Sequence, residues 1–393
     1  MRPARLAGMT GIGVDRMGHL ADAAGGADVL RLENLDTDVP PHPAALEATR
    51  HAIVDDASNS YLPFVGQTRL RRAVAAHVSR LSGAPCDGER NVIICAGGLS
   101  GILNVLLAIV DTGDEVILTD PTYVGLINRV RLAGAVPRLV PFVKDAGGWT
   151  LDRDALYRRV TSKTRAFLLM SPSMPSGGAL TREDWQAVAD IVRERDVWLV
   201  HDTAMQRILF DGRAVVDPAG LPGMAERTIT VGSASKELRL IGWRVGWIAA
   251  PERLLPDLAL VSMGNVVVPV GIAQSAAAIA LEAGDADVAR ATAIWQARRD
   301  LILQEMEGLP VIRPAGGWSL LVDGAALGMT GAELSARLFE RARIAATPMN
   351  GWGEVNGDQF LRLVFANEPI ARLRGIGDRT RRAWARRGDS GVS

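Results

Sequence analysis

Short apolar runs alternate with segments of helical periodicity along most of the chain. The apolar runs are rich in valine, isoleucine and leucine, and they predict buried strands at residues 91–95, 115–119, 135–140, 166–170, 197–200, 228–231 and 245–249. Amphipathic helices are predicted between them, at residues 101–110, 123–133, 153–160 and 181–195. Because strands alternate with helices, the pattern predicts an α/β fold whose mainly parallel central sheet is sandwiched by helices.

The pattern changes after about residue 285. One long helix is predicted over 287–308, opening on an aspartate and closing on a glycine, and strands are predicted at 311–313, 318–322 and 360–365. We therefore predict three parts: an N-terminal segment over 1–50 that joins the small domain, a large domain over 51–285, and a smaller α+β domain over 286–393. The arginine-rich end, 379–393, predicts a frayed helix and tail.

The segment between two of the predicted strands contains the most informative chemistry. Lys236 lies close to the hydroxyl residues Ser233 and Ser235, and Arg244 follows shortly after it. The amine can form a Schiff base, while the hydroxyls and the guanidinium can bind a phosphate, and pyridoxal phosphate needs both. A solvated lysine on a polar loop is the alternative, but flanking buried strands favour the first interpretation.

A glycine-rich turn over residues 95–101 joins a predicted strand to a predicted helix. Its backbone N–H groups and the positive end of the helix would suit a phosphate. Ala96, Gly98 and Gly101 also resemble a degraded dinucleotide fingerprint, with Asp120 where a ribose-binding acid would lie. One glycine of that fingerprint is missing, and its loop normally follows the first strand of the fold, so this alternative is the weaker one.

Three further residues lie in or after predicted strands. Tyr123 can stack on a planar heterocycle. Asp202 ends a buried strand and needs a partner, which a pyridinium N–H would provide, whereas its neighbour His201 points to the other face and is predicted to pack. Arg362 interrupts an apolar strand, which fits a substrate carboxylate, and an arginine paired within the protein is the alternative.

Together these residues resemble the fold type I pyridoxal-phosphate enzymes, specifically the class I/II aminotransferases, over about residues 30–365. The stretch 59–71 matches a family segment whose tyrosine, here Tyr61, reaches the cofactor of the neighbouring subunit. The resemblance implies a homodimer with active sites at its interface, and Lys236 and Asp202 as catalytic residues. It implies cofactor contacts from Gly98, Leu99, Tyr123, Asp202, Ser233, Ser235, Lys236, Arg244 and Tyr61. It also implies substrate contacts from Arg362 and Asn34.

Two departures from the family pattern affect the expected reaction. Met174 and Met205 replace the asparagine and the tyrosine that donate hydrogen bonds to the cofactor's phenolic oxygen. Methionine cannot donate a hydrogen bond. Amino transfer between an amino acid and a 2-oxo acid is the main expectation. The alternative is a non-transaminating enzyme of specialised metabolism that catalyses β- or γ-elimination or replacement, cyclisation, or oxidation of an amino acid.

Composition narrows the partners to small molecules. The 393 residues include 44 basic and 44 acidic side chains, so no overall charge favours nucleic acid or a membrane surface. Cys86 and Cys95 lack metal-ligand spacing, so we expect no metal site and a reducing cytoplasm. No signal peptide or membrane span is expected, and the segment before Leu30 is too short for the DNA-binding module of aminotransferase-like regulators.

The sequence gives only a weak indication of the substrate side chain. Asn34, Asp36, Trp318 and Trp352 are candidate pocket walls, and no second basic residue can be assigned to an acidic side chain. We therefore expect an apolar or aromatic substrate.

Overall fold

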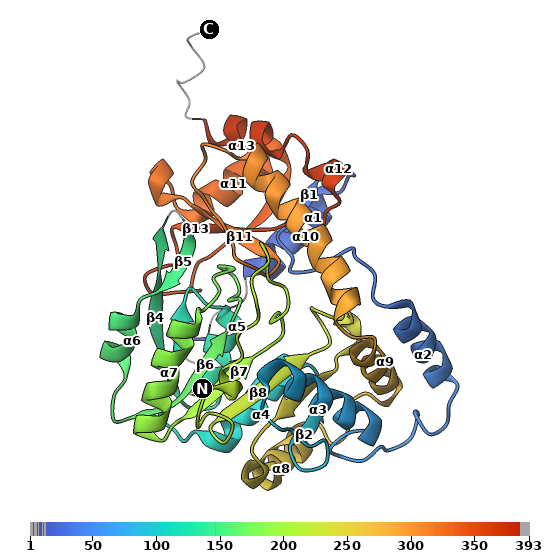
Figure 1. Ribbon diagram of the computed structural model, residues 1–393. Coiled ribbons are helices and arrows are strands. Elements are labelled where there is room, and N and C mark those ends of the chain that lie inside the picture. Colours follow the sequence, from blue (N-terminus) through green and yellow to red (C-terminus); the bar gives the residue numbers. More distant parts are fainter. Residues whose placement is uncertain are drawn as a thin grey trace.

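The computed structural model of the protein describes residues 3, 6, 8, 9, 11, 13–145 and 147–385. It contains two β-sheets, each covered by helices (Figure 1). The predicted α/β class is confirmed, with a largely parallel central sheet. The predicted tail beyond residue 385 lies outside the described residues.

The larger sheet has eight strands. In spatial order they are β2 (Val92–Cys95), β9 (Gly246–Ala249), β8 (Thr228–Ser233), β7 (Trp198–Asp202), β6 (Thr164–Met170), β3 (Glu115–Asp120), β4 (Val136–Asp145) and β5 (Gly148–Leu151). The five strands from β8 to β4 run parallel, whereas β9 is antiparallel to both of its neighbours and β5 is antiparallel to β4. The carboxyl ends of the parallel strands therefore meet at one edge of the sheet, where ligands bind in folds of this kind.

Helices cover both faces of this sheet because neighbouring residues of its strands point in opposite directions. Leu168 of β6 packs into the apolar cluster formed with α4 (Gly98–Ile109), α5 (Val124–Leu132) and α8 (Leu255–Asn265). Its neighbour Phe167 packs into the cluster that contains Trp185 of α7 (Arg182–Arg195). The rest of that face is covered at β2 and β9 by α3 (Thr68–Ser82) and α9 (Gly271–Glu282), and α2 (Pro43–Ile53) packs on α9. Near β4, α6 (Arg153–Arg159) completes the layer.

The smaller sheet has five strands, in the order β1 (Leu30–Leu32), β12 (Ile344–Pro348), β13 (Phe360–Val364), β11 (Ser319–Asp323) and β10 (Val311–Ile312). Around it lie α1 (Gly13–Ala24), α10 (Asp285–Glu305), α11 (Gly331–Ala342), α12 (Ile370–Leu373) and α13 (Ile376–Trp384). In Figure 1, α10 runs from the neighbourhood of α9 up to this smaller sheet. The chain's early strand β1 pairs in parallel with β12, so segments from both ends of the sequence share one sheet.

The sequence predicts capping residues at the start of two helices, and the structure has a side-chain cap at one of them, α7. Thr181 and Asp184 form the predicted capping box at the start of α7. The predicted start of the long helix is wrong by two residues, because α10 begins at Asp285 with Gly284 as its N-cap, and Asp287 lies in the first turn. An aspartate in that turn still stabilises the helix through the positive end of its dipole.

Candidate active site

One cavity of about 300 Å³ collects almost all of the predicted site residues. It lies at the carboxyl ends of β7 and β8, between the two sheets. The predicted residues among its lining are Asn34, Gly98, Leu99, Tyr123, Asp202, Ser233, Ser235, Lys236, Arg244 and Arg362. Tyr61 is the exception, because its side chain is 85% exposed and does not line the cavity.

Lys236 presents its amine to this cavity. Its Nζ donates a 2.7 Å hydrogen bond to the carbonyl oxygen of Leu35 and lies 4.8 Å from the ring centre of Trp318. Burial lowers the pKa of Lys236 to about 7; nearby Asp36 opposes this shift, and Arg362 and Arg244 add to it. Near neutral pH a large fraction of the amine is therefore uncharged and able to act as a nucleophile.

Asp202 ends β7 and is buried on the cavity wall. Burial raises its pKa to about 6, although the Ala204 N–H group, which donates a 3.0 Å hydrogen bond, and the charge of Arg129 both act against that rise. Arg129 was missed in the sequence, although it is a conspicuous arginine on the largely apolar helix α5. Its Nε donates to the carbonyl oxygen of Leu99 at 2.8 Å, which holds its charge beside the cavity.

The residues predicted to bind a phosphate lie against one another. Arg244 donates through Nη1 to Ser235 Oγ at 3.2 Å, and the Ser235 N–H group donates to Ser233 Oγ at 3.1 Å. Gly97 is the N-cap of α4 and has a φ of +88°, and a Cβ atom there would come within 2.5 Å of Arg244 Nη2. Two hydroxyls, a guanidinium and a helix N-terminus thus surround one point, and this arrangement fits the phosphate of pyridoxal phosphate.

Arg362 of β13 is buried, and its hydrogen bonds within the described residues go to uncharged groups. It donates to Thr347 Oγ1 at 3.2 Å and to the carbonyl oxygen of Glu33, and its Nη1 lies 3.9 Å from the sulfur of Met174. Burial lowers the pKa of Arg362 to about 10, so it stays charged at neutral pH. Within the described part of the chain Arg362 forms no ion pair, which leaves its charge available to a carboxylate in the cavity.

Trp352 connects Arg362 to the predicted stacking ring. Its ring lies 5.0 Å from Arg362 Cζ and meets the Tyr123 ring edge-on at 5.4 Å between centres. Asp120 fixes the loop that carries Trp352, because its carboxylate accepts bonds of 2.9, 2.8 and 3.0 Å from the N–H groups of residues 354–356. Asp120 therefore has a structural partner, and the alternative in which it binds a ribose is wrong.

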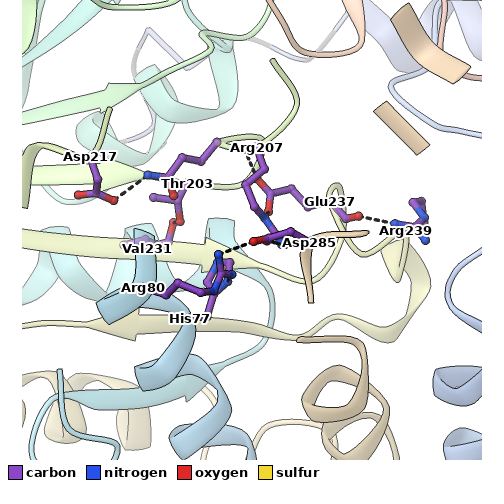
Figure 2. Close-up of polar contacts among 10 residues, drawn as sticks. His77, Arg80, Thr203, Arg207, Asp217, Val231, Glu237, Arg239 and Asp285 are labelled. Carbon is purple, nitrogen blue, oxygen red and sulfur yellow. Dashed lines mark hydrogen bonds and ion pairs between the residues drawn. The ribbon is translucent and has the colours of Figure 1, made fainter. Parts of the chain in front are cut away.

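A second network, which the sequence did not predict, holds the lysine segment in place (Figure 2). The Glu237 carboxylate accepts bonds of 2.6 Å from both the backbone N–H group and Nε of Arg207, which follows Asp202 along the chain. Arg207 Nη1 then bonds Asp285 at the start of α10 at 2.8 Å, and Arg80 of α3 bonds the same carboxylate at 2.6 Å. The neighbours of Lys236 and Asp202 are thereby tied to each other and to the helix that leads to the small sheet.

The remaining candidates have different surroundings. Met174, Met205 and Asn34 line the cavity. Trp318 is buried next to the Lys236 amine, and Asp36 acts on Lys236 only through its charge.

In the described residues there is no cluster of three or more potential metal ligands. None of the helices described is long and apolar enough to cross a bilayer.

Comparisons with known proteins agree with this geometry. Residues 28–376 match the sequence model of aminotransferase class I and II. The arginine–pyruvate transaminase AruH of Pseudomonas aeruginosa is 32% identical over 89% of both chains, and the probable N-succinyldiaminopimelate aminotransferase DapC of Mycobacterium tuberculosis is 35% identical over 81% of this chain and 80% of that one.

Solved structures give the same assignment. The N-succinyldiaminopimelate aminotransferase of Mycobacterium tuberculosis superposes with a TM-score of 0.90 at 31% identity, covering 98% of this chain and 99% of that one. Aspartate aminotransferase from Thermus thermophilus, solved with maleate, gives a TM-score of 0.89 at 29% identity and covers 98% and 100% of the two chains. The relatives support amino transfer rather than the non-transaminating alternative. The chain therefore belongs to the class I and II aminotransferases, the fold type I enzymes that use pyridoxal 5′-phosphate to move amino groups between amino acids and 2-oxo acids.

Proposed function

We propose that the cavity around Lys236 is the active site of this aminotransferase and that the predicted residues have the roles given below. One observation carries the proposal: Lys236, whose pKa is lowered, and Asp202, whose pKa is raised, line the same cavity as the residues that fit a phosphate. Perturbed titratable groups that converge in one cavity are typical of active sites.

Six groups would hold the cofactor. Ser233, Ser235, Arg244 and the N-terminus of α4 would bind its phosphate, Tyr123 would stack on its ring, and Asp202 would bind the ring nitrogen. When bound, pyridoxal phosphate supplies an electron-withdrawing ring that stabilises negative charge at the substrate Cα atom. The pKa of Asp202, about 6, leaves most of its carboxylate ionised at neutral pH, and a protonated ring nitrogen beside it would lower that pKa further.

Lys236 would anchor the cofactor covalently and, once an amino acid has displaced it, move the proton. With a pKa of about 7 the free amine can both accept a proton from Cα and give it up again near neutral pH. Leu35 and Trp318 restrict where Nζ can lie. A lysine with fewer contacts would have to be ordered at each turnover, and that ordering costs free energy.

Arg362 would bind the substrate α-carboxylate and so orient the Cα–H bond. A buried guanidinium without an ion pair gains most from a two-pronged contact with a carboxylate. Asn34 lines the cavity and would add a neutral contact to the substrate. The names of the relatives cover donors as different as arginine, N-succinyldiaminopimelate and aspartate, so they leave the donor's side chain open.

We also propose a homodimer in which Tyr61 completes the partner's site. Tyr61 and its neighbour Phe64 are 85% and 48% exposed, and further exposed apolar residues lie at Ile53, Val54, Val266 and Val267. Large apolar side chains gathered on few segments are typical of an interface. A tyrosine that is 85% exposed, within the segment that resembles the family's phosphate-binding stretch, supports this assignment.

The domain division and the location are further parts of the proposal. α10 begins at Asp285, which supports a boundary between a large cofactor-binding domain over 51–285 and a small domain over 286–393. Pairing of β1 with β12 supports joining the N-terminal segment, 1–50, to the small domain, although α2 at the end of that segment packs on α9 of the large domain. Cys86 and Cys95 are free thiols. Unpaired cysteines are compatible with the reducing cytoplasm, where we place the protein.

The reaction itself is tested with single substrates. Purified enzyme loaded with cofactor should convert an amino acid into its 2-oxo acid in a single turnover, with the amino group retained on the cofactor, and a second 2-oxo acid should reverse this. Absorbance of the cofactor and mass analysis of the products measure both halves. Loss of a side-chain substituent, or consumption of oxygen, would show a different reaction.

The lowered pKa of Lys236 predicts how cofactor uptake depends on pH. Only an uncharged amine adds to an aldehyde, so the rate at which cofactor-free protein takes up pyridoxal phosphate should rise about tenfold per pH unit below 7 and level off above it. Stopped-flow absorbance measures this rate, with Nα-acetyl-lysine as the control amine. A rate that rises like the control's up to about pH 10 would contradict the assigned environment.

The two arginines should separate into different roles. Arg362→Ala should raise KM for the amino donor about tenfold to a hundredfold while the cofactor stays bound, because a charged hydrogen-bonded contact to substrate is lost. Arg244→Ala should instead weaken cofactor retention, which dialysis followed by absorbance measures, and Tyr61→Phe should do so to a smaller extent. The reverse pattern would refute both roles, and a fully active monomer in sedimentation would refute the role of Tyr61.

The two methionines predict a shifted titration. Without donors to the cofactor's phenolic oxygen its negative charge is less stabilised, so the nitrogen linking Lys236 to the cofactor should keep its proton through neutral pH. Met174→Asn and Met205→Tyr should each lower that pKa by about one unit. An absorbance titration of the resting enzyme measures it. A midpoint well below pH 7 in the unmodified enzyme would mean that another group donates to this oxygen.

A further inference from the structure

Among the described residues, five charged side chains line the active-site cavity, and the proposed function assigns a role to four of them. Arg244 would face the cofactor phosphate, Asp202 the ring nitrogen and Arg362 the substrate carboxylate, while Lys236 anchors the cofactor. The fifth is Asp15. A charged group in a substrate cavity that neither the cofactor nor the shared part of the substrate uses is a candidate for recognising the substrate's variable part.

Asp15 lies in the first turn of α1, near the N-terminal end of the described chain, where it is exposed and lines the cavity. Among the residues that the structure describes, it forms neither a hydrogen bond nor an ion pair. The pKa of the Tyr123 phenol indicates that Asp15 is nearby. Burial is the main cause of the rise in this pKa, the charge of Arg362 lowers it, and the charge of Asp15 raises it. Asp15 and Arg362 therefore both lie within electrostatic reach of the same hydroxyl.

Much of the rest of the cavity lining is apolar. These side chains include Val14, Leu35, Leu126, Met170 and Ile241. A substrate whose carboxylate is held by Arg362 would pass its side chain along this surface before reaching solvent. The surface suits methylene groups, and a carboxylate at the mouth suits a positive group at their end.

We propose that Asp15 is a specificity-determining residue that favours amino donors whose aliphatic side chain ends in a cation, either an amine or a guanidine. This inference rests on the proposed function and assigns it a substrate class that differs from the apolar or aromatic class expected from the sequence. Asp15 has another possible role, since an aspartate in the first turn stabilises a helix. That role would not distinguish between substrates, so substrate preference separates the two.

The expected effect is moderate because Asp15 is accessible to water. Exposed ion pairs contribute about 0.2–1 kcal/mol, which corresponds to a preference of up to about fivefold. The preference should grow at low ionic strength, where charges are less screened.

The experiment compares donors that differ in charge and little else, using the enzyme loaded with cofactor. For the unmodified enzyme, kcat/KM should be about two- to fivefold higher for arginine than for citrulline, and for lysine than for norleucine. In Asp15→Asn both ratios should fall to about one, and Asp15→Glu should restore them. Asp22→Asn is the matched control: it changes the charge of the same helix outside the cavity, at a residue paired with Arg31, and should leave the ratios as they were.

Binding without chemistry gives a second measurement. 5-Guanidinopentanoate and 5-ureidopentanoate lack the α-amine and differ in charge, and the first should bind about two- to fivefold more tightly by calorimetry, with the difference lost in Asp15→Asn. Two outcomes of the kinetic comparison would overturn the inference and leave the proposed function intact. In one, arginine and citrulline, and lysine and norleucine, are used with kcat/KM ratios near one; in the other, the ratios are the same in Asp15→Asn as in the unmodified enzyme. No transfer from any donor would overturn the proposed function instead.

Discussion

Burial of the Lys236 amine and the Asp202 carboxyl group is the constraint on which the rest of the site depends. Burial lowers the pKa of Lys236 to about 7 and raises that of Asp202 to about 6, so each group lies close to neutral pH, where it can exchange protons. Neither shift would exist on a solvated loop. Both follow from the position of the residues where β7 and β8 end, beneath the small sheet.

The pKa shifts of Lys236 and Asp202 serve catalysis only if both side chains are held in position. Polar contacts between neighbouring segments hold them. The Glu237–Arg207 pair ties the residue after Lys236 to the segment after Asp202, and Arg207 reaches Asp285 at the start of α10. Asp120 holds the loop that positions Trp352 against Arg362. A change in the relative position of the two sheets would therefore act on Lys236 and on Arg362 together.

The fold and most of the candidate site could be predicted because their signals are local. Buried strands of the larger sheet appear as apolar runs, and Lys236, Ser233, Ser235 and Arg244 lie close together in the sequence. The contacts that position them could not be predicted, because Glu237 and Arg207, or Asp120 and residues 354–356, meet only after the chain folds. Asp15 was missed for the same reason, since nothing in its sequence neighbourhood indicates a cavity.

We propose that Lys236 carries the cofactor, and a covalent label would identify the lysine that does. Borohydride reduction of the loaded enzyme fixes the cofactor to the amine that holds it, and peptide mapping then identifies that amine. The chain has only two other lysines, Lys144 and Lys163. We expect one modified peptide, containing Lys236, and none from Lys236→Ala. A label on Lys144 or Lys163 in the active enzyme, with Lys236 unmodified, would contradict it.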